Sequence, residues 1–172
     1  FHLYLGHESA LSKVYHAHPD KKIYFTEQWT GAKGNFAGDF MWHMEHVVIG
    51  TMANWSSLVL EWNLANDPNF GPHTPGGCTE CLGAMTIAGS EIKRNVSYYI
   101  IGQVAPFVSR GAFRVETKSV NTQIQSIGFV RPDGKKVLLA LNTGKECVFT
   151  IDFEQKKYDF TLPEKSASTI VW

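Results

Sequence analysis

The period of the hydrophobic pattern changes near residue 113, and this change limits the possible folds more than any other feature of the sequence. Over the first hundred residues, short apolar runs alternate with longer segments in which apolar residues recur at helical spacing. From Phe113 onward the spacing becomes two, with turn residues about every 8–12 positions. The first pattern is typical of an α/β layer and the second of an antiparallel sandwich. We therefore expect an α/β domain over 1–110 and a β-sandwich domain over 111–172.

Strands and helices are expected to alternate in the first domain. Apolar runs predict strands at Leu3–Leu5, Ile23–Glu27 and Ser57–Glu61, with a further short one at Ala84–Ala88. Helical spacing predicts helices at Ser9–His18, Phe36–Ala53 and Val96–Phe107. A loop rich in Asn, Asp, Pro and Gly spans 65–82, and loops of this length in compact domains are often functional.

The strand Ile23–Glu27 ends in a carboxylate, which is unusual for a buried element. Strict alternation would place Ile23 and Phe25 on the same face as Glu27, with Tyr24, Thr26 and Gln28 on the other. In an α/β barrel the side chains at the C-terminal ends of the strands point into the active site. Glu27 is therefore a candidate catalytic residue.

The strand at Ser57–Glu61 also ends in polar and aromatic residues. Trp62 shares a strand face with Leu58 and Leu60, so an inward set of leucines would bring its indole into a pocket. Glu61 would then face the helical layer, which argues against Glu61 as a second catalytic acid.

The second domain is predicted to consist of short antiparallel strands. Arg131-Pro-Asp-Gly134 is a strong turn signal between Ser126–Val130 and Lys136–Leu141. Further turns are expected at 142–144 and 154–157, before strands at Tyr158–Leu162 and Ser168–Trp172.

Composition excludes some functions and favours others. The formal net charge is zero and no basic run occurs, so nothing indicates nucleic-acid binding. No run of 18 apolar residues is present, so no membrane span is expected. Aromatic residues make up 13% of the chain, and aromatic faces often contact the C–H faces of sugars.

The cysteines and histidines give weaker signals. Cys78-Thr-Glu-Cys81 has CxxC spacing but no second pair, which argues against a structural zinc site and leaves a local disulfide or two free thiols. His43 and His46 share a helix face, yet no third ligand is apparent. We expect neither a metal nor a cofactor.

Four segments together resemble glycoside hydrolase family 30, the glucosylceramidase-like retaining β-glycosidases. The four segments are His2-Leu-Tyr4, Phe25-Thr-Glu27, the run Glu61-Trp-Asn-Leu-Ala65 with Pro68 and Gly71-Pro72 after it, and the closing Ser-Thr-Ile-Val-Trp172. The resemblance covers essentially the whole chain. It implies the C-terminal part of a (β/α)8 barrel, strands six to eight, followed by the β-sandwich that accompanies this barrel.

The resemblance also implies a chemistry and a set of site residues. Glu27 corresponds to the catalytic nucleophile, and the acid/base falls after the fourth barrel strand, which the chain does not contain. From the resemblance and the strand geometry, the expected substrate-binding residues are Trp62, Tyr4, His2, Trp29 and Asn63. The implied activity is O-glycosyl hydrolysis of a β-glucoside or β-glucan, in carbohydrate or sphingolipid metabolism.

Several expectations concern the chain as a whole. It opens inside a predicted strand, which suggests a piece of a longer protein that is inactive alone. Three barrel strands would expose apolar faces, so we expect the missing N-terminal part or a second copy to cover them. The resemblance implies a secreted or periplasmic location, and Gln28-Trp29 with the 76–81 loop resembles β-1,6-glucanases more than the lysosomal enzyme. The alternative function is a non-catalytic carbohydrate-binding or structural sandwich module.

Overall fold

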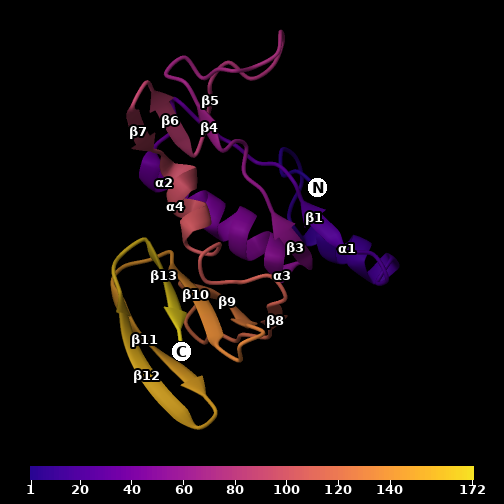
Figure 1. Cartoon of the computed structure of the whole chain (residues 1–172). Helices are drawn as coiled ribbons and strands as arrows, with labels where there is room; N and C mark the ends of the chain where they lie inside the picture. The colour runs from indigo at the N-terminus through magenta and orange to yellow at the C-terminus, as the bar shows by residue number, and fades with distance from the viewer. The chain divides into compact units, whose positions relative to one another are not determined.

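The computed structural model describes every residue from Phe1 to Trp172 and divides into two compact units (Figure 1). The first unit is Phe1–Gly102 and the second is Gln103–Trp172. The first unit alternates strands and helices, whereas the second contains only strands and turns. The change of hydrophobic period in the sequence therefore corresponds to a change of architecture.

Three parallel backbone segments form the centre of the first unit. β1 (Ile23–Phe25) pairs in parallel with β3 (Ser56–Val59). On the other side of β1, His2 forms an isolated parallel bridge with Glu27, and the Phe1 carbonyl accepts the Thr26 N–H at 2.9 Å. Helix α1 (Ser9–Ala17) connects the first segment to β1, as predicted. Parallel strands need such crossover connections, and both connections here are helical.

The first of the three segments is shorter than the sequence predicts. Residues Leu3–Leu5 form no strand, and only His2 contributes a bridge. The chain bends away through Gly6, whose φ of +87° suits glycine, before α1 begins. The predicted strand is therefore displaced to Phe1–His2.

The second connection is a continuous helical segment over the predicted range. It consists of α2 (Phe36–Trp42), the π-helical η1 (His43–Gly50) and α3 (Thr51–Ala53). Asn35 caps its start, because the Asn35 side chain accepts the Gly38 N–H at 2.9 Å. Met44, Val47 and Val48 of this segment are buried, whereas Phe36 at its start is exposed.

The third helix ends earlier than predicted. α4 covers Val96–Gly102, and turns replace the predicted helix from 103 to 107. Pro106 explains the difference, since it cannot donate a helical hydrogen bond and disfavours a helical residue before it. Val96 and Ile100 are buried, as the apolar spacing predicts, whereas Tyr99 is exposed.

Burial divides the strand layer into a covered face and an open one. Ile23 and Phe25 are buried, whereas Tyr24 between them is 46% exposed. On β3 and the residues after it, Leu58 and Leu60 are 40% and 45% exposed. The alternation predicted for Leu58, Leu60 and Trp62 is confirmed, and their shared face is open.

The alternation predicted for the β1 segment is wrong beyond Phe25. The buried positions are 23, 25, 28 and 30, so the phase changes across Thr26 and Glu27. The regular strand ends at Phe25, and its pairing with β3 is already irregular between Ile23 and Phe25. Glu27 consequently leaves the buried face of Ile23 and Phe25, and Gln28 is buried in its place.

Short pairings hold the two ends of the long loop of the first unit. β2 (Thr30–Gly31) pairs antiparallel with β5 (Cys81–Leu82), and β4 (Ala65–Asn66) pairs in parallel with β6 (Met85–Ala88). β7 (Glu91–Arg94), which the sequence did not predict because it is polar, forms a hairpin with β6. The loop between β4 and β5 extends away from these strands (Figure 1).

The second unit contains a four-stranded antiparallel sheet and a separate hairpin. The sheet order is β13-β10-β9-β8, with β8 at Phe113–Val115, β9 at Ile124–Val130, β10 at Lys136–Asn142 and β13 at Ser166–Val171. The predicted hairpin across Arg131–Gly134 is confirmed, with Lys136 opposite Val130. The hairpin β11 (Cys147–Phe153) and β12 (Lys156–Leu162) packs on the sheet through a core of Ile124, Ala140 and Leu162.

Candidate active site

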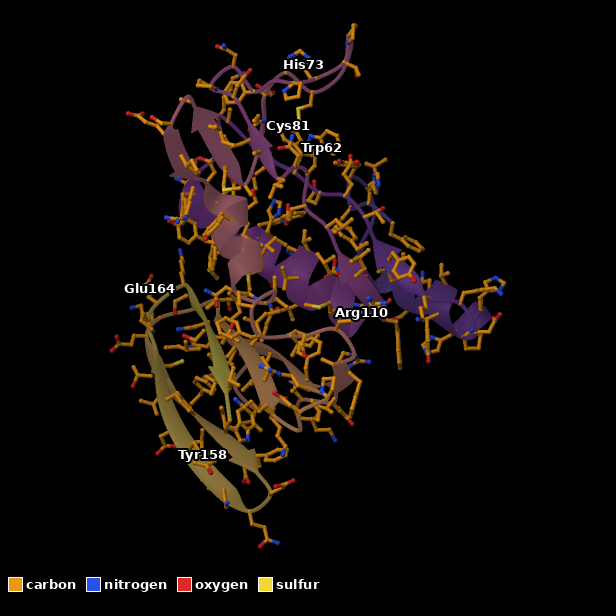
Figure 2. The ribbon with its side chains drawn as sticks, in the orientation of Figure 1. Trp62, His73, Cys81, Arg110, Tyr158 and Glu164 are labelled. Atoms are coloured by element: carbon orange, nitrogen blue, oxygen red, sulfur yellow. A yellow bond between two sulfur atoms is a disulfide. The ribbon has the colours of Figure 1, made fainter.

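A pocket of about 310 Å³ lies in the first unit where the parallel segments end. Its lining residues are Tyr4, Glu27, Trp29, Trp62, Cys78 and Cys81. They come from four stretches of chain: the N-terminal segment, the end of β1, the end of β3 and the long loop. Figure 2 shows Trp62 and Cys81 close together, with His73 on the loop beyond them. Glu27 is the single carboxylate among the lining residues.

Tyr4 holds the Glu27 carboxylate. The Tyr4 hydroxyl donates a hydrogen bond to Glu27 Oε1 at 2.5 Å. Burial, followed by this hydrogen bond and the nearby negative charge, raises the pKa of Tyr4 to about 12. Tyr4 therefore stays protonated and remains a hydrogen-bond donor at acidic and neutral pH. The Glu27 side chain is 33% exposed, so it can be reached from the pocket.

Replacing Tyr4 with Phe removes this donor while keeping the ring. A hydrogen bond to a charged group contributes about 1.5–3 kcal/mol, and the half-exposed position of Tyr4 places the effect at the low end. We expect kcat to fall about tenfold with KM nearly unchanged. Steady-state kinetics of the complete protein measure this, and an unchanged kcat would show that the bond has no role in the reaction.

His2 lies beside the carboxylate but not in the pocket lining. Its Nδ1 is 3.9 Å from Glu27 Oε1, which is beyond hydrogen-bond distance, and its ring contacts Tyr4 edge-on with 5.6 Å between centroids. His2 therefore supports the Tyr4 ring and adds a polar group near the carboxylate.

The two indoles of the pocket are joined through the backbone. Trp29 and Trp62 form a parallel β-bridge, and the backbone N–H of Trp62 donates to the backbone carbonyl of Gln28 at 2.6 Å. The side-chain amide of Gln28 donates to the Leu3 carbonyl and accepts a hydrogen bond from the backbone N–H of Trp29. Gln28 thus links the segment that carries Tyr4 to the one that carries Glu27. Sequence reasoning missed it, because strict alternation gave Gln28 no role in the pocket.

Asn63 lies outside the pocket lining. Its Oδ1 atom is buried without a hydrogen-bond partner, and its carbonyl accepts the Ala84 N–H at 2.7 Å. Asp67, another polar residue of this region, accepts the N–H groups of Asn69 and Gly71 and so orders its own loop. The structure brings together Glu27, Tyr4, Trp29 and Trp62, with His2 beside them, and leaves Asn63 out.

Glu61 faces the helical layer, as the alternation on β3 predicts, and pairs with a histidine there. Glu61 Oε1 lies 2.7 Å from His43 Nδ1, and the two side chains are 3% and 5% exposed. The other carboxylate oxygen, Oε2, is buried without a partner. Burial raises the pKa of Glu61, and the contact with His43 opposes that rise without cancelling it. Neither residue of the pair lines the pocket, although Glu61 directly precedes Trp62 in the sequence.

The raised pKa of Glu61 predicts how stability depends on pH. Well below pH 4.5, the ordinary pKa of a glutamate, the Glu61 carboxyl is protonated in both the folded and unfolded states. As pH rises above 4.5, the unfolded state ionises first, so the folded state loses stability until the pH passes the folded pKa. We expect Glu61→Gln to remove this loss, which melting temperatures measured from pH 4 to pH 8 would show. An identical pH slope in both proteins would contradict the raised pKa.

The two histidines of η1 have separate partners. His43 contacts Glu61, whereas His46 Nδ1 lies 3.4 Å from Glu8 Oε1. The shared helix face suggested by the sequence therefore does not bring the two histidines to one ligand.

Cys78 and Cys81 form a disulfide, which decides between the two alternatives that the sequence left open. Cys147, in the second unit, is a free thiol. None of the helices has the length and apolar character that a membrane span requires.

Comparison with known proteins shows the family of the chain. Over 95% of its length the chain is 31% identical to the endo-1,6-beta-D-glucanase neg1 of Aspergillus fumigatus, and residues 111–170 match the glycosyl hydrolase family 30 beta sandwich domain. The chain belongs to glycoside hydrolase family 30. The lysosomal acid glucosylceramidase of Mus musculus is a more distant family-30 relative, 23% identical over 96% of the chain. Each of these two relatives is covered over 34% of its own length, so the chain spans about a third of the relatives it matches.

Solved family-30 structures share the fold of the chain. The endo-beta1,6-glucanase BT3312 superposes with a TM-score of 0.92 at 33% identity, covering 99% of this chain and 40% of that one. SrfJ from Salmonella typhimurium superposes with a TM-score of 0.91 at 28% identity, covering 100% of this chain and 40% of that one.

Proposed function

We propose that this chain supplies the nucleophile side of a retaining β-glucosidase or β-glucanase site. Residues 1–110 would form the C-terminal part of a (β/α)8 barrel, and residues 111–172 its sandwich domain. The main support for this proposal is the position of Glu27. It follows a parallel strand, accepts a hydrogen bond from Tyr4, and shares a pocket with two indoles. This arrangement fits a carboxylate that attacks a sugar held against aromatic faces.

Glu27 would attack the anomeric carbon and form a glycosyl-enzyme ester. Tyr4 holds Oε1 in place, and Trp29 and Trp62 offer their faces to the C–H groups of the sugar. A retaining site needs a second carboxyl group about 5–5.5 Å from the first, which protonates the leaving oxygen and then activates water. The pocket lining contains no second carboxylate, so we assign the acid/base to a part of the protein outside this chain.

The open face of the strand layer supports a larger barrel. Tyr24 on β1, Leu58 on the neighbouring parallel strand β3, and Leu60 just after β3 are each at least 40% exposed. Monomeric proteins rarely expose a continuous apolar face of this kind. We propose that the remaining barrel strands cover it, and that the chain alone associates with a second copy or aggregates. A monodisperse monomer of the chain that melts cooperatively would contradict this.

We propose β-1,6-glucan as the substrate, outside the cell or in the periplasm. The relatives with the higher identities include endo-1,6-β-D-glucanases from two fungi, whereas the glucosylceramidases are 23–26% identical. The test gives the complete protein β-1,6-glucan and, separately, glucosylceramide. Release of β-configured products from the glucan would support the proposal. Turnover of glucosylceramide with the glucan left intact would reject the substrate, and turnover of neither would reject the activity.

The alternative is a non-catalytic module carried by the sandwich. A hollow of about 810 Å³ in the second unit could hold a ligand, but Val148, Phe149, Ile151 and Phe153 contribute a largely apolar lining. Such a surface suits a protein strand better than a hydrated polysaccharide. Binding to insoluble glucan that survives both Glu27→Gln and Trp62→Ala would favour the alternative.

A further inference from the structure

The Cys78–Cys81 disulfide lines the same pocket as Glu27 and the two indoles. Nothing in the proposed hydrolytic chemistry uses a sulfur atom. Both cysteines nevertheless lie on the pocket surface: Cys78 comes from the loop between β4 and β5, and Cys81 from the start of β5. The disulfide therefore forms part of the pocket, and the proposed reaction gives the disulfide no role.

The two ends of the bond are anchored very differently. Cys81 is 5% exposed and lies on β5, opposite Gly31, two residues after Trp29. Its carbonyl accepts a hydrogen bond from the Asn66 side chain at 2.8 Å. Cys78 lies in the loop between β4 and β5, outside any strand, and is only partly buried. The disulfide ties this loop residue to a strand that is already fixed beside Trp29.

The bond can add little to overall stability. The stabilisation from a disulfide grows with the length of chain that it closes, and these cysteines are three positions apart. For so short a loop the chain-entropy estimate is about 2 kcal/mol at most. Its main physical consequence is local: it fixes where Cys78 stands at the edge of the pocket.

We propose that the Cys78–Cys81 disulfide is a wall of the sugar-binding pocket and that its reduction weakens the binding of a β-glucosyl chain. A dithiol reductant donates two electrons and two protons, the S–S bond breaks, two thiols form, and the reductant becomes a disulfide. Cys78 is then released from β5, and the sugar loses an apolar contact at the rim. The inference rests on the proposed function, because the ligand is the glucan of that site.

The test compares the complete wild-type protein, before and after dithiol treatment, with Cys78→Ala. This variant removes the bond and leaves Cys81 as a buried thiol, so β5 keeps its packing. Cys147→Ala is the matched control, because Cys147 is a free thiol in the other unit. Intact mass after thiol alkylation confirms which proteins carry the bond.

We expect KM for a β-1,6-linked glucose oligomer to rise about tenfold on reduction and in Cys78→Ala, corresponding to about 1.4 kcal/mol of lost binding. The value of kcat should change less than twofold, and Cys147→Ala should respond to dithiol like the wild type. An unchanged KM in protein shown to lack the bond would overturn the proposal. A fall in kcat and melting temperature with KM unchanged would overturn it as well, in favour of a structural role.

A second readout does not depend on activity. Disulfides quench nearby indoles, so reduction should raise the emission of Trp29 and Trp62, and it should have no such effect in Cys78→Ala. If the complete protein hydrolyses no β-glucoside but its tryptophan emission rises on reduction, the proposed function is wrong. The disulfide would then still lie beside the two indoles of the pocket. If the emission does not change on confirmed reduction, the disulfide is not a wall of this pocket.

Discussion

Replacing Glu27 with Gln is expected to lower kcat by about 10⁴-fold or more, since removing a catalytic nucleophile eliminates the covalent route. Folding should be little affected, because the Glu27 side chain is one-third exposed and Gln can still accept the Tyr4 hydroxyl. The measurement is kcat of the complete protein on a β-glucoside, together with its melting temperature. A variant that keeps more than about a tenth of the activity would exclude Glu27 as the nucleophile.

A small substitution at the same site separates a chemical role from a structural one. In Glu27→Ala, added azide can enter the vacated space and attack the anomeric carbon, which would restore turnover and give a glycosyl azide of inverted configuration. Glu80→Gln is the control, because Glu80 is a carboxylate that pairs with Lys33 at the surface. We expect its activity to match the wild type.

Replacing His43 with Ala is expected to cost about 3–5 kcal/mol of folding free energy at neutral pH. The change leaves Glu61 buried with neither oxygen paired, and removing one partner of a buried pair is more destabilising than removing both. Denaturation of the complete protein, followed through the transition that includes the first unit, measures the effect. The double variant His43→Leu/Glu61→Met should recover most of the loss.

The exposed ion pair of the same unit provides the contrast. Lys33 and Glu80 are 2.7 Å apart at the surface, where water screens the charges, so Lys33→Ala should leave the melting temperature unchanged. If His43→Ala were equally neutral, the buried contact with Glu61 would not contribute to stability.

Part of this site can be predicted from the sequence, because successive side chains of a regular strand alternate between its two faces. This alternation places Trp62 on the face of Leu58 and Leu60 and turns Glu61 toward the helices, and the structure confirms both. The candidate catalytic carboxylate, Glu27, follows from an apolar run that ends in a carboxylate. The hairpin across Arg131–Gly134 follows from its turn residues.

The rest depends on contacts between distant segments, which a one-dimensional pattern does not contain. The regular strand ends at Phe25, so alternation fails for Glu27 and Gln28, and the link from Gln28 to Leu3 could not be foreseen. The CxxC spacing of Cys78 and Cys81 fits a disulfide and two thiols equally well. The partner of His43, Glu61, lies 18 residues away in the segment after β3.

The most direct test of the account is to trap the glycosyl-enzyme with a 2-fluoro β-glucoside and to locate the label by mass spectrometry. In the complete protein we expect one added sugar on Glu27, none in Glu27→Gln, and none on residues 1–172 alone. A sugar on another residue, or no label on a protein that hydrolyses the same β-glucoside bond, would contradict the assignment of Glu27 as the nucleophile.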